Sequence, residues 1–287
     1  MSGGADSLAL LVLAVAAGCR VTAVHVDHGL RPGSAGEAEV VRAVADGLGA
    51  AFQAEQADVD PGPNLEARAR VARHRVLGPD AALGHTADDQ AETVLLNLLR
   101  GAALDGLAGI RPGPRHPILD LRRTDTEEVC RANGLEWVVD PSNVDPRLRR
   151  NRVRHELVPL LASIGERDPV PVLARQARIL RDVADHLDHE AAALDPADCA
   201  ALRARPEVVA RAALRRWLRS ASPDGHPPDA AALDRVLAVV VGDAVATDLG
   251  GGWRVARTAG RLRLERSGGR TEPAEPARSA GDGDGRA

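Results

Sequence analysis

The chain has 287 residues, of which 44% are hydrophobic and 27% charged, and its formal net charge is −4. This composition excludes a disordered chain, and the length suggests two domains at roughly 150 residues each. No apolar run reaches the roughly 18 residues of a membrane span. The apolar stretch after Ser7 has no basic segment before it, which argues against a signal peptide. We therefore expect a cytoplasmic protein without a membrane partner.

Two further features of the composition limit the function. The cysteines Cys19, Cys130 and Cys199 are far apart and form no C-x-x-C, so neither a zinc site nor a disulfide framework is indicated. All basic residues are arginine, because the chain contains no lysine. The net charge does not suggest a nucleic-acid partner, although a local basic patch would suffice for one.

The first half of the chain alternates helical and extended patterns. Helices are predicted where apolar residues recur at helical spacing, with ends marked by residues such as Gly18, Asn64, Thr86 and Gly101. The expected elements are helices at 7–18, 34–50, 64–77 and 87–101, and strands at 20–29, 51–59 and 81–86. This alternation predicts an α/β fold with a parallel sheet and helices on both faces.

The alternation is lost after about residue 117. A long amphipathic helix at 171–194 is expected to lead to a small α+β unit with helices at 206–221 and 229–241 and a β-hairpin at 250–265. The expected domains are a catalytic domain at 1–165, a linker helix at 166–194, a substrate-binding domain at 195–266 and a disordered tail at 267–287.

The segment SGGADS at residues 2–7 stands directly before the first helix. Its glycines let backbone N–H groups approach an anion, and the helix N-terminus adds a partial positive charge. Ser2 and Ser7 can donate hydrogen bonds, whereas Asp6 would repel a phosphate and is better suited to hold a Mg²⁺ ion that bridges phosphate oxygens. These six residues alone leave a solvated terminus and a phosphate-binding loop equally open.

A loop of this kind usually follows a β-strand, yet no residues precede Met1. Because a central parallel strand is buried on both faces, its loss would be costly. We expect that translation starts upstream of Met1. If the strand is instead absent, the alternative is a tRNA- or nucleotide-binding protein that has lost catalysis.

A helix over residues 88–100 places Asp89 and Glu92 about 60° apart at positions i and i+3. Two carboxylates in a first turn can clamp an ammonium group. The alternative is that they, together with Asp88, only favour the helix dipole, by about 0.3–1 kcal/mol each. The helix also has an apolar face, made of Ala91, Val94, Leu95, Leu98 and Leu99.

Three other groups of polar residues are candidates. His25 and Asp27 end a strand, at the edge where open α/β sheets bind ligands, although a structural histidine is equally compatible and zinc lacks a third ligand. Arg70 on helix 64–77 would meet an α-phosphate or a substrate carboxylate, or belong to a solvated face. The run RLRRNRVRH at 147–155 would neutralise nucleic-acid phosphates, or be solvated too.

Several of these segments resemble a known family. SGGADS resembles the PP-loop of ATP pyrophosphatases, which cleave ATP between the α- and β-phosphates and adenylate a carbonyl oxygen. The remaining segments are similar to the tRNA(Ile)-lysidine synthetase family, in that family's order: AVHVDHGLRPGSAGEA at 23–38, NLEARARVARHRVL at 64–77, LGHTADDQAETVLLNLLRGAALDGLAGI at 83–110, DPSNVDPRLRRNRVRHELVPLL at 140–161 and GGGWRV at 250–255.

This resemblance implies a fold of the adenine nucleotide alpha hydrolase type and a ligase that joins free L-lysine to carbon 2 of the wobble cytidine in tRNA(Ile) with anticodon CAU. ATP first adenylates the cytidine, and the lysidine formed changes codon reading from AUG to AUA. The implied site residues are Ser2, Gly3, Gly4, Ala5, Asp6, Ser7, His25 and Asp27 for ATP, Asp6 for Mg²⁺, Asp89 and Glu92 for lysine, Arg149, Asn151, Arg152 and Arg154 for tRNA, and Asp6, Arg70, Asp89 and Glu92 for catalysis.

Other members of the superfamily are less compatible with the sequence. A tRNA thiolase needs reactive cysteines, often as C-x-x-C, and the three here are isolated. GMP, NAD and asparagine synthetases would lack the basic segment and the GHTADDQAET run. The sequence leaves the oligomeric state open, with a homodimer as one alternative.

Overall fold

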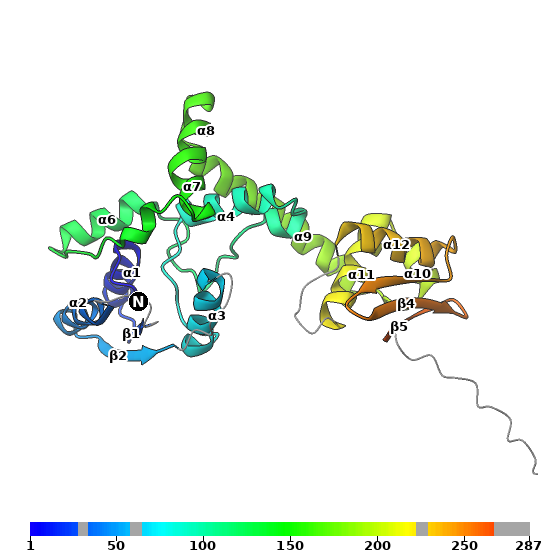
Figure 1. Cartoon of the computed structure of the whole chain (residues 1–287), viewed down its shortest axis with the longest axis horizontal. Coiled ribbons are helices and arrows are strands. Elements are labelled where there is room, and N and C mark those ends of the chain that lie inside the picture. Colours follow the sequence, from blue (N-terminus) through cyan, green and yellow to red (C-terminus); the bar gives the residue numbers. More distant parts are fainter. Residues whose placement is uncertain (28–33, 58–64, 222–228, 267–287) are drawn as a thin grey trace, which may run out of the picture. The chain divides into compact units, whose positions relative to one another are not determined.

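The computed structural model describes residues 1–27, 34–57, 65–221 and 229–266 (Figure 1). The chain divides into two compact units, Met1–Ala184 and Asp185–Ala287. The division falls inside helix α9 (Pro169–Ala192), which corresponds to the helix predicted at 171–194. The predicted domain limits themselves stay a prediction.

The first unit begins with the glycine-rich segment and helix α1 (Ala5–Ala16). The amides of Ser7 and Leu8 donate to the Gly4 carbonyl at 3.1 Å and start the helix. Gly18, with a φ of +78°, ends it as predicted, since this left-handed conformation suits glycine.

A parallel pair of strands follows, β1 (Thr22–Asp27) and β2 (Ala51–Gln56), joined by helix α2 (Ser34–Gly47). Ala23 of β1 packs on one face against residues of α1 and α2, among them Leu11 and Val41. On the other face, Val26 packs against Ala72 of helix α3 (Leu65–Leu77). The α/β class is therefore confirmed, because helices cover both faces of parallel strands.

The strand predicted at 81–86 is wrong. These residues form an irregular segment that leads into helix α4 (Ala87–Leu99). The amide of Leu83 bonds to the Arg115 carbonyl, and that of Ala87 bonds to the Leu121 carbonyl, both at 2.8 Å. The segment is thus held by the loop before helix α6 (Arg123–Ala132) rather than by a neighbouring strand in the described part of the chain.

The rest of the first unit is helical. The short helix α5 (Leu104–Leu107) and helix α6 (Arg123–Ala132) precede a 3₁₀ turn η1 (Pro141–Val144). A continuous helical run then passes through α7 (Arg149–Arg152), a π-helical turn η2 (Val153–Leu157) and α8 (Val158–Gly165). Pro159 has no amide hydrogen for the carbonyl four residues earlier, which explains the interrupted α-helical pattern.

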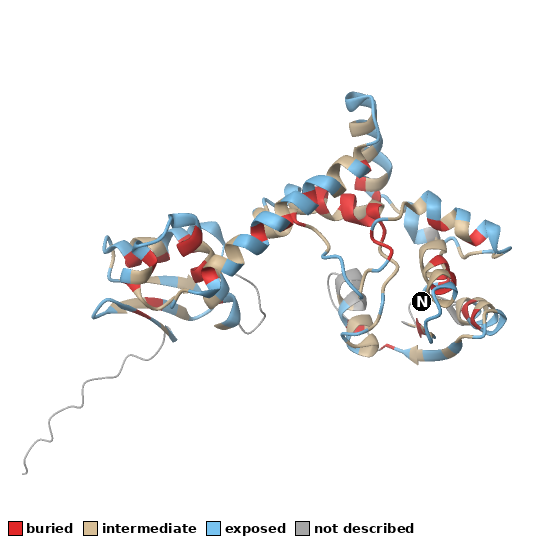
Figure 2. Cartoon of the chain, turned by 180° about the vertical axis from the view of Figure 1, so that it is seen from behind, coloured by how far each residue is buried: buried red, intermediate tan, exposed pale blue. Residues whose placement is uncertain are grey.

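The second unit packs three helices against a small antiparallel sheet. Figure 2 shows its buried residues on the facing sides of these elements, and they include Leu214, Val236, Val255 and Leu262. The hairpin predicted at 250–265 is confirmed, and β3 adds a third strand. The elements are α10 (Cys199–Arg203), α11 (Glu207–Ala221), α12 (Ala230–Val241), β3 (Ala246–Gly250), β4 (Trp253–Thr258) and β5 (Arg261–Arg266). None of the helices in the described residues has the length and apolar character needed to cross a membrane.

Candidate active site

The glycine-rich segment before α1 forms a turn with few polar contacts. Gly3 has a left-handed φ of +70°, and a side chain there would lie 3.1 Å from Cγ2 of Val138, so glycine is favoured. The Ser7 hydroxyl donates to the Gly4 carbonyl at 2.9 Å. Ser2 is exposed, and its hydroxyl accepts from the Gly4 amide at a long 3.4 Å. The turn therefore presents backbone amides and a serine hydroxyl at a helix start, an arrangement that binds anions.

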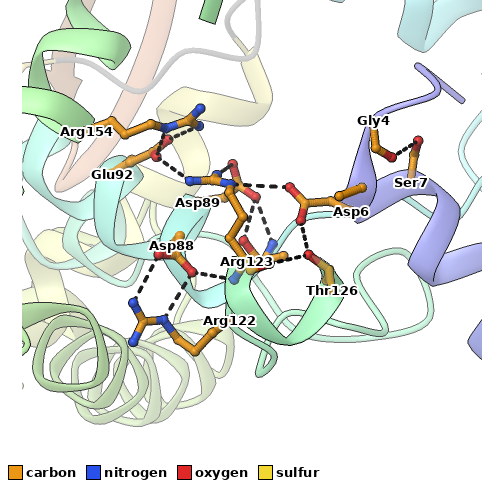
Figure 3. A network of polar contacts seen from close by, with 12 residues as sticks. Gly4, Asp6, Ser7, Asp88, Asp89, Glu92, Arg122, Arg123, Thr126 and Arg154 are labelled. Carbon is orange, nitrogen blue, oxygen red and sulfur yellow. Dashed lines mark hydrogen bonds and ion pairs between the residues drawn. The ribbon is translucent and has the colours of Figure 1, made fainter. Parts of the chain in front are cut away.

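Asp6 connects this turn to a cluster of carboxylates and arginines (Figure 3). Its Oδ1 accepts a hydrogen bond from the Thr126 hydroxyl, and its Oδ2 lies 3.6 Å from Nε of Arg123. The same guanidinium lies 3.7 Å from Oδ1 of Asp89 and 3.7 Å from Oε1 of Glu92. Arg123 thus sits among three carboxylates at ion-pair distances too long for hydrogen bonds.

Two arginines from the run α7–η2 bond Asp89 and Glu92 more tightly. Arg150 donates from Nη2 to Oδ1 of Asp89 at 2.8 Å and from Nε to Oε2 of Glu92 at 2.6 Å. Arg154 donates from Nε to Oε1 of Glu92 at 2.7 Å. Because Glu92 is only 2% exposed, its charge requires such pairing.

The first turn of α4 holds Asp89 in place. Its Oδ2 accepts from the amide and the hydroxyl of Thr86, at 2.8 and 3.0 Å, as in one half of a capping box. Burial of the carboxylate opposes its ionisation, but the Arg150 guanidinium and the Thr86 amide outweigh burial and lower the pKa of Asp89. Asp89 is therefore an anion at neutral pH and is suited to hold a cation.

Asp88 and Asp89 point to different partners. Arg122 binds both oxygens of Asp88, at 3.1 and 3.2 Å, and the Arg123 amide donates to Asp88 at 2.8 Å. Burial again opposes the charge, and these donors lower the pKa of Asp88. Asp88 thus fixes the start of α6, whereas Asp89 shares the Arg123 guanidinium with Asp6.

The pKa of Asp6 shifts the other way. Burial raises it, and the hydrogen bond from Thr126 and the charge of Arg123 offset this only in part. Asp6 is thus the carboxylate of the cluster that most lacks compensation for its charge. A carboxyl group whose pKa is shifted by burial and by neighbouring charges is a candidate for a functional position.

Gly84 brings the two parts of the site into contact. A Cβ at this position would lie 2.8 Å from the carbonyl oxygen of Asp6 and 3.2 Å from the amide nitrogen of Ser7. Only glycine permits this approach of two backbones. The residues just before α4 and the residues that start α1 are therefore positioned directly against each other.

The structure gathers four of the predicted site residues: Asp6, Asp89, Glu92 and Arg154. His25 lies on β1, buried, with Nδ1 2.9 Å from the Met1 carbonyl oxygen, beside the start of the turn. Asp27 ends the same strand.

The other predicted residues of α3 and α7 have no contact with these carboxylates in the described part of the chain. Arg70 is on α3, and its side chain is outside the described residues. Asn151 is buried, and its Nδ2 donates to the carbonyls of Ser142 and Asp145 at 2.7 and 3.0 Å, which secures the preceding turn. Arg149 and Arg152 are exposed. The roles of these residues toward ligands stay predictions.

Four residues of the site are not predicted from the sequence: Arg122, Arg123, Thr126 and Arg150. One signal was present for Arg150, since it stands four residues before Arg154 and such residues project to the same side of a helix. The pair Arg122–Arg123 carried no comparable signal, because its relation to Asp88 and Asp89 arises only from the tertiary fold. Two residues of the predicted apolar face of α4, Leu98 and Leu99, are exposed instead of buried.

The sequence of the chain matches known proteins in both of its units. Residues 1–161 match the family model of the PP-loop domain, and residues 198–263 match the TilS substrate binding domain. The chain is 42% identical to the tRNA(Ile)-lysidine synthase of Mycobacterium leprae, over 78% of this chain and 75% of that protein. It is 43% identical to the synthase of Mycolicibacterium paratuberculosis, with the same coverage of 78% and 75%, and 42% identical to that of Nocardia farcinica, with coverage of 75% and 71%.

A solved structure, the U34-tRNA thiolase NcsA from Methanococcus maripaludis with its [4Fe-4S] cluster, is similar over 63% of this chain and 71% of that chain. Its sequence identity of 18% and TM-score of 0.49 are too low to bear on function. The PP-loop domain model covers more than half of this chain, and each of the three synthases is at least 42% identical to it. The chain therefore belongs to the tRNA(Ile)-lysidine synthase family.

Proposed function

We propose that this protein joins L-lysine to carbon 2 of the wobble cytidine of a CAU-anticodon tRNA(Ile). The cytidine carbonyl oxygen attacks the α-phosphate of ATP, and pyrophosphate leaves. The ε-ammonium of lysine first loses a proton to solvent; the free amine then attacks carbon 2 and gives up a second proton, and AMP leaves with the C–O bond electrons. The observation that carries the proposal is the convergence of Asp6 from the glycine-rich turn with Asp89 and Glu92 on one guanidinium, that of Arg123.

The turn at residues 2–7 would bind the phosphates of ATP through its backbone amides and the hydroxyl groups of Ser2 and Ser7. Asp6 would supply one carboxylate to Mg²⁺, with phosphate oxygens and water as the other ligands, as is usual for this ion. The Oδ2 atom of Asp6 fits this role because its ion pair with Nε of Arg123 is long, at 3.6 Å. When bound, the ion neutralises charge on the phosphates.

Asp89 and Glu92 would bind the ammonium group of lysine. Both carboxylates already bond arginines, so the ammonium must replace one of these contacts. Arg123 is the partner that yields most easily, because it approaches both carboxylates at 3.7 Å without a hydrogen bond, whereas Arg150 and Arg154 bond them at 2.6–2.8 Å. The lowered pKa of Asp89 suits it to pair with a cation rather than to accept a proton.

The other predicted residues complete this proposal. His25 and Asp27 would lie near the nucleotide, and Arg70 near a phosphate or the substrate carboxylate. Arg149, Asn151, Arg152 and Arg154 would serve tRNA binding, Asn151 by holding the turn at 141–145. We also propose cytoplasmic localisation and keep a homodimer as a prediction.

The buried cysteines weigh against a sulfur-transfer enzyme. Cys130 and Cys199 are buried, and burial raises the pKa of each thiol, so neither is an activated nucleophile. Cys19 is exposed after the end of α1. The geometry therefore favours transfer of an amine over transfer of sulfur.

The decisive experiment incubates the protein with ATP, labelled lysine and a CAU-anticodon tRNA(Ile) transcript. We expect label in the tRNA and release of AMP and pyrophosphate, and no label in a transcript whose wobble cytidine is replaced by uridine. Release of pyrophosphate without lysine transfer would contradict the proposal, and no reaction of either kind would support a binding protein that has lost catalysis.

A further inference from the structure

A groove of about 450 Å³ lies between α4 and the helical run α7–η2–α8, within the first unit. Leucines from both sides line it, Leu96 and Leu99 from α4 and Leu157 and Leu160 from the helical run. Leu99 is 70% exposed and Leu160 is 53% exposed. Exposed leucines facing one groove indicate that the groove has a ligand or a partner.

The same groove carries a surplus of positive charge. Arg100, Arg149 and Arg152 line it against a single carboxylate, that of Glu156. Glu156 accepts from Arg152 at 2.8–3.1 Å. Arg149 is exposed, and among the described residues its guanidinium has neither a hydrogen bond nor an ion pair. An apolar groove edged by arginines fits a ligand that combines a flat apolar ring with negative charge.

The groove continues the face of α4 that carries the carboxylates. Leu96 and Leu99 follow Glu92 by four and seven residues, so they lie on its side of the helix, with Leu99 about 10 Å further along the axis. On the facing run, Arg150 and Arg154 bond the carboxylates, while Arg149 and Arg152 line the groove. An RNA strand that presents one nucleotide to the carboxylates would therefore bring an adjacent nucleotide to the groove.

We propose that this groove binds the base of an unpaired nucleotide next to the wobble cytidine, with Arg149 and Arg152 on its phosphates. The proposal rests on the function proposed above, which supplies the RNA. Unpaired loop bases are recognised on apolar surfaces and on the planes of arginine side chains. Arg149 thus gains the phosphate partner that it lacks within the described residues.

The first experiment measures binding of a CAU-loop RNA hairpin to the full chain by fluorescence anisotropy. Leu99→Gln is expected to weaken binding about tenfold, the usual cost of losing one base contact, whereas Leu98→Gln has little effect. Leu98 is the matched control because it is also exposed, at 57%, and does not line the groove. Equal affinities of the two variants would overturn the proposal.

The second experiment separates charge at the groove from charge in general. Arg149→Gln should lower the slope of log affinity against log salt by about 0.7, the value for one phosphate of a single strand. Arg131→Gln removes the same charge on α6, where Arg131 is bound to Glu127, and should leave the slope nearly unchanged. Glu156→Gln should strengthen binding, because it releases Arg152. An unchanged slope for Arg149→Gln would count against the proposal.

A hairpin with 4-thiouridine on either side of the wobble cytidine locates the contact. We expect one of the two positions to crosslink to the peptide that contains residues 149–160. Crosslinks only elsewhere, or a loss of self-association in Leu99→Gln by sedimentation without loss of RNA affinity, would assign the groove to another partner. The test is independent of lysine transfer: a wild-type protein that modifies tRNA while Leu99→Gln and Leu98→Gln bind alike would refute only the groove.

Discussion

The turn at residues 2–7 and the cluster around Glu92 are neighbours with opposite construction. In the turn, Ser2 is exposed, and a short side-chain hydrogen bond joins the Ser7 hydroxyl to the Gly4 carbonyl. In the cluster, Asp89 and Glu92 are buried and receive short hydrogen bonds from Arg150 and Arg154. Backbone N–H groups at a surface can bond water until a ligand replaces it, whereas a buried charge requires a charged or hydrogen-bonding partner. ATP would therefore supply the partner for the donors of the turn, whereas arginines of the protein already pair the carboxylates of the cluster.

Loss of Asp6 is expected to have the largest effect, because Asp6 belongs to both regions. Asp6→Ala should reduce pyrophosphate release and lysidine formation at least 100-fold, the scale on which a group that stabilises transferred charge acts. Steady-state release of pyrophosphate with saturating ATP and tRNA measures this. Asp46→Ala, on the exposed side of α2, is the matched control and should behave as wild type. Comparable rates in the two variants would show that the turn works without its carboxylate.

The adjacent residues Asp88 and Asp89 test whether the cluster binds lysine. Asp89→Asn should raise the KM for lysine about ten- to hundredfold and leave adenylation of tRNA intact, since one charge-assisted hydrogen bond is lost. Asp88→Asn should leave the KM for lysine unchanged, because Asp88 bonds Arg122 and the Arg123 amide instead. Lysine titrations followed by label in tRNA measure both. A similar KM in the two variants would reject the assignment of the clamp.

Glu92 tests how much the pairing in the cluster stabilises the fold. Glu92→Gln removes the carboxylate that pairs with Arg154 and one of the two that pair with Arg150, and should lower the free energy of unfolding by about 2 kcal/mol. This is less than for a fully buried pair because the two arginine side chains are 27% and 23% exposed. Urea unfolding measures the change. The surface pair Glu127–Arg131 gives the control, where Glu127→Gln should cost no more than about 0.5 kcal/mol.

The pH dependence of stability gives a smaller effect with a definite sign. The pKa of Asp88 is lowered in the folded protein from its ordinary value of 3.8, so its contribution is present above that value and is lost as the pH falls through the folded pKa. The difference in melting temperature between wild type and Asp88→Asn should therefore be constant near neutral pH and shrink in strong acid. Thermal unfolding across this range measures it, and a difference that grows toward acid would contradict the assignment.

Ser2 should give the smallest effect. Its hydroxyl is exposed and makes long contacts, at 3.4 Å with the Gly4 amide and at 3.5 Å with the Ser7 hydroxyl, so it adds little to the fold. Ser2→Ala should raise the KM for ATP about two- to fivefold, the loss of a single neutral hydrogen bond, and leave the melting temperature unchanged. A drop in melting temperature would mean that the turn is ordered before ATP binds.

The sequence predicted those parts of the molecule that depend on local pattern. Helix α1 with its glycine end, the parallel strands and the start of α4 at Thr86 follow from spacing and capping. The irregular segment 81–86 was mistaken for a strand because its partners, Arg115 and Leu121, are about thirty residues away in sequence. In the arginine run, Arg150 and Arg154 bond the carboxylates while Arg149 and Arg152 line the groove. This division depends on the π-helical turn at Val153–Leu157, which a regular helical projection does not include.

The contact at Gly84 has a consequence for how the two regions work together. The backbone before α4 lies directly against the backbone of Asp6 and Ser7, so no side chain separates the proposed phosphate site from the proposed ammonium site at this point. Any shift of the turn on closing around ATP must displace the first turn of α4 as well. Binding of the nucleotide would thereby shift Asp89, which would favour an order in which ATP binds before lysine.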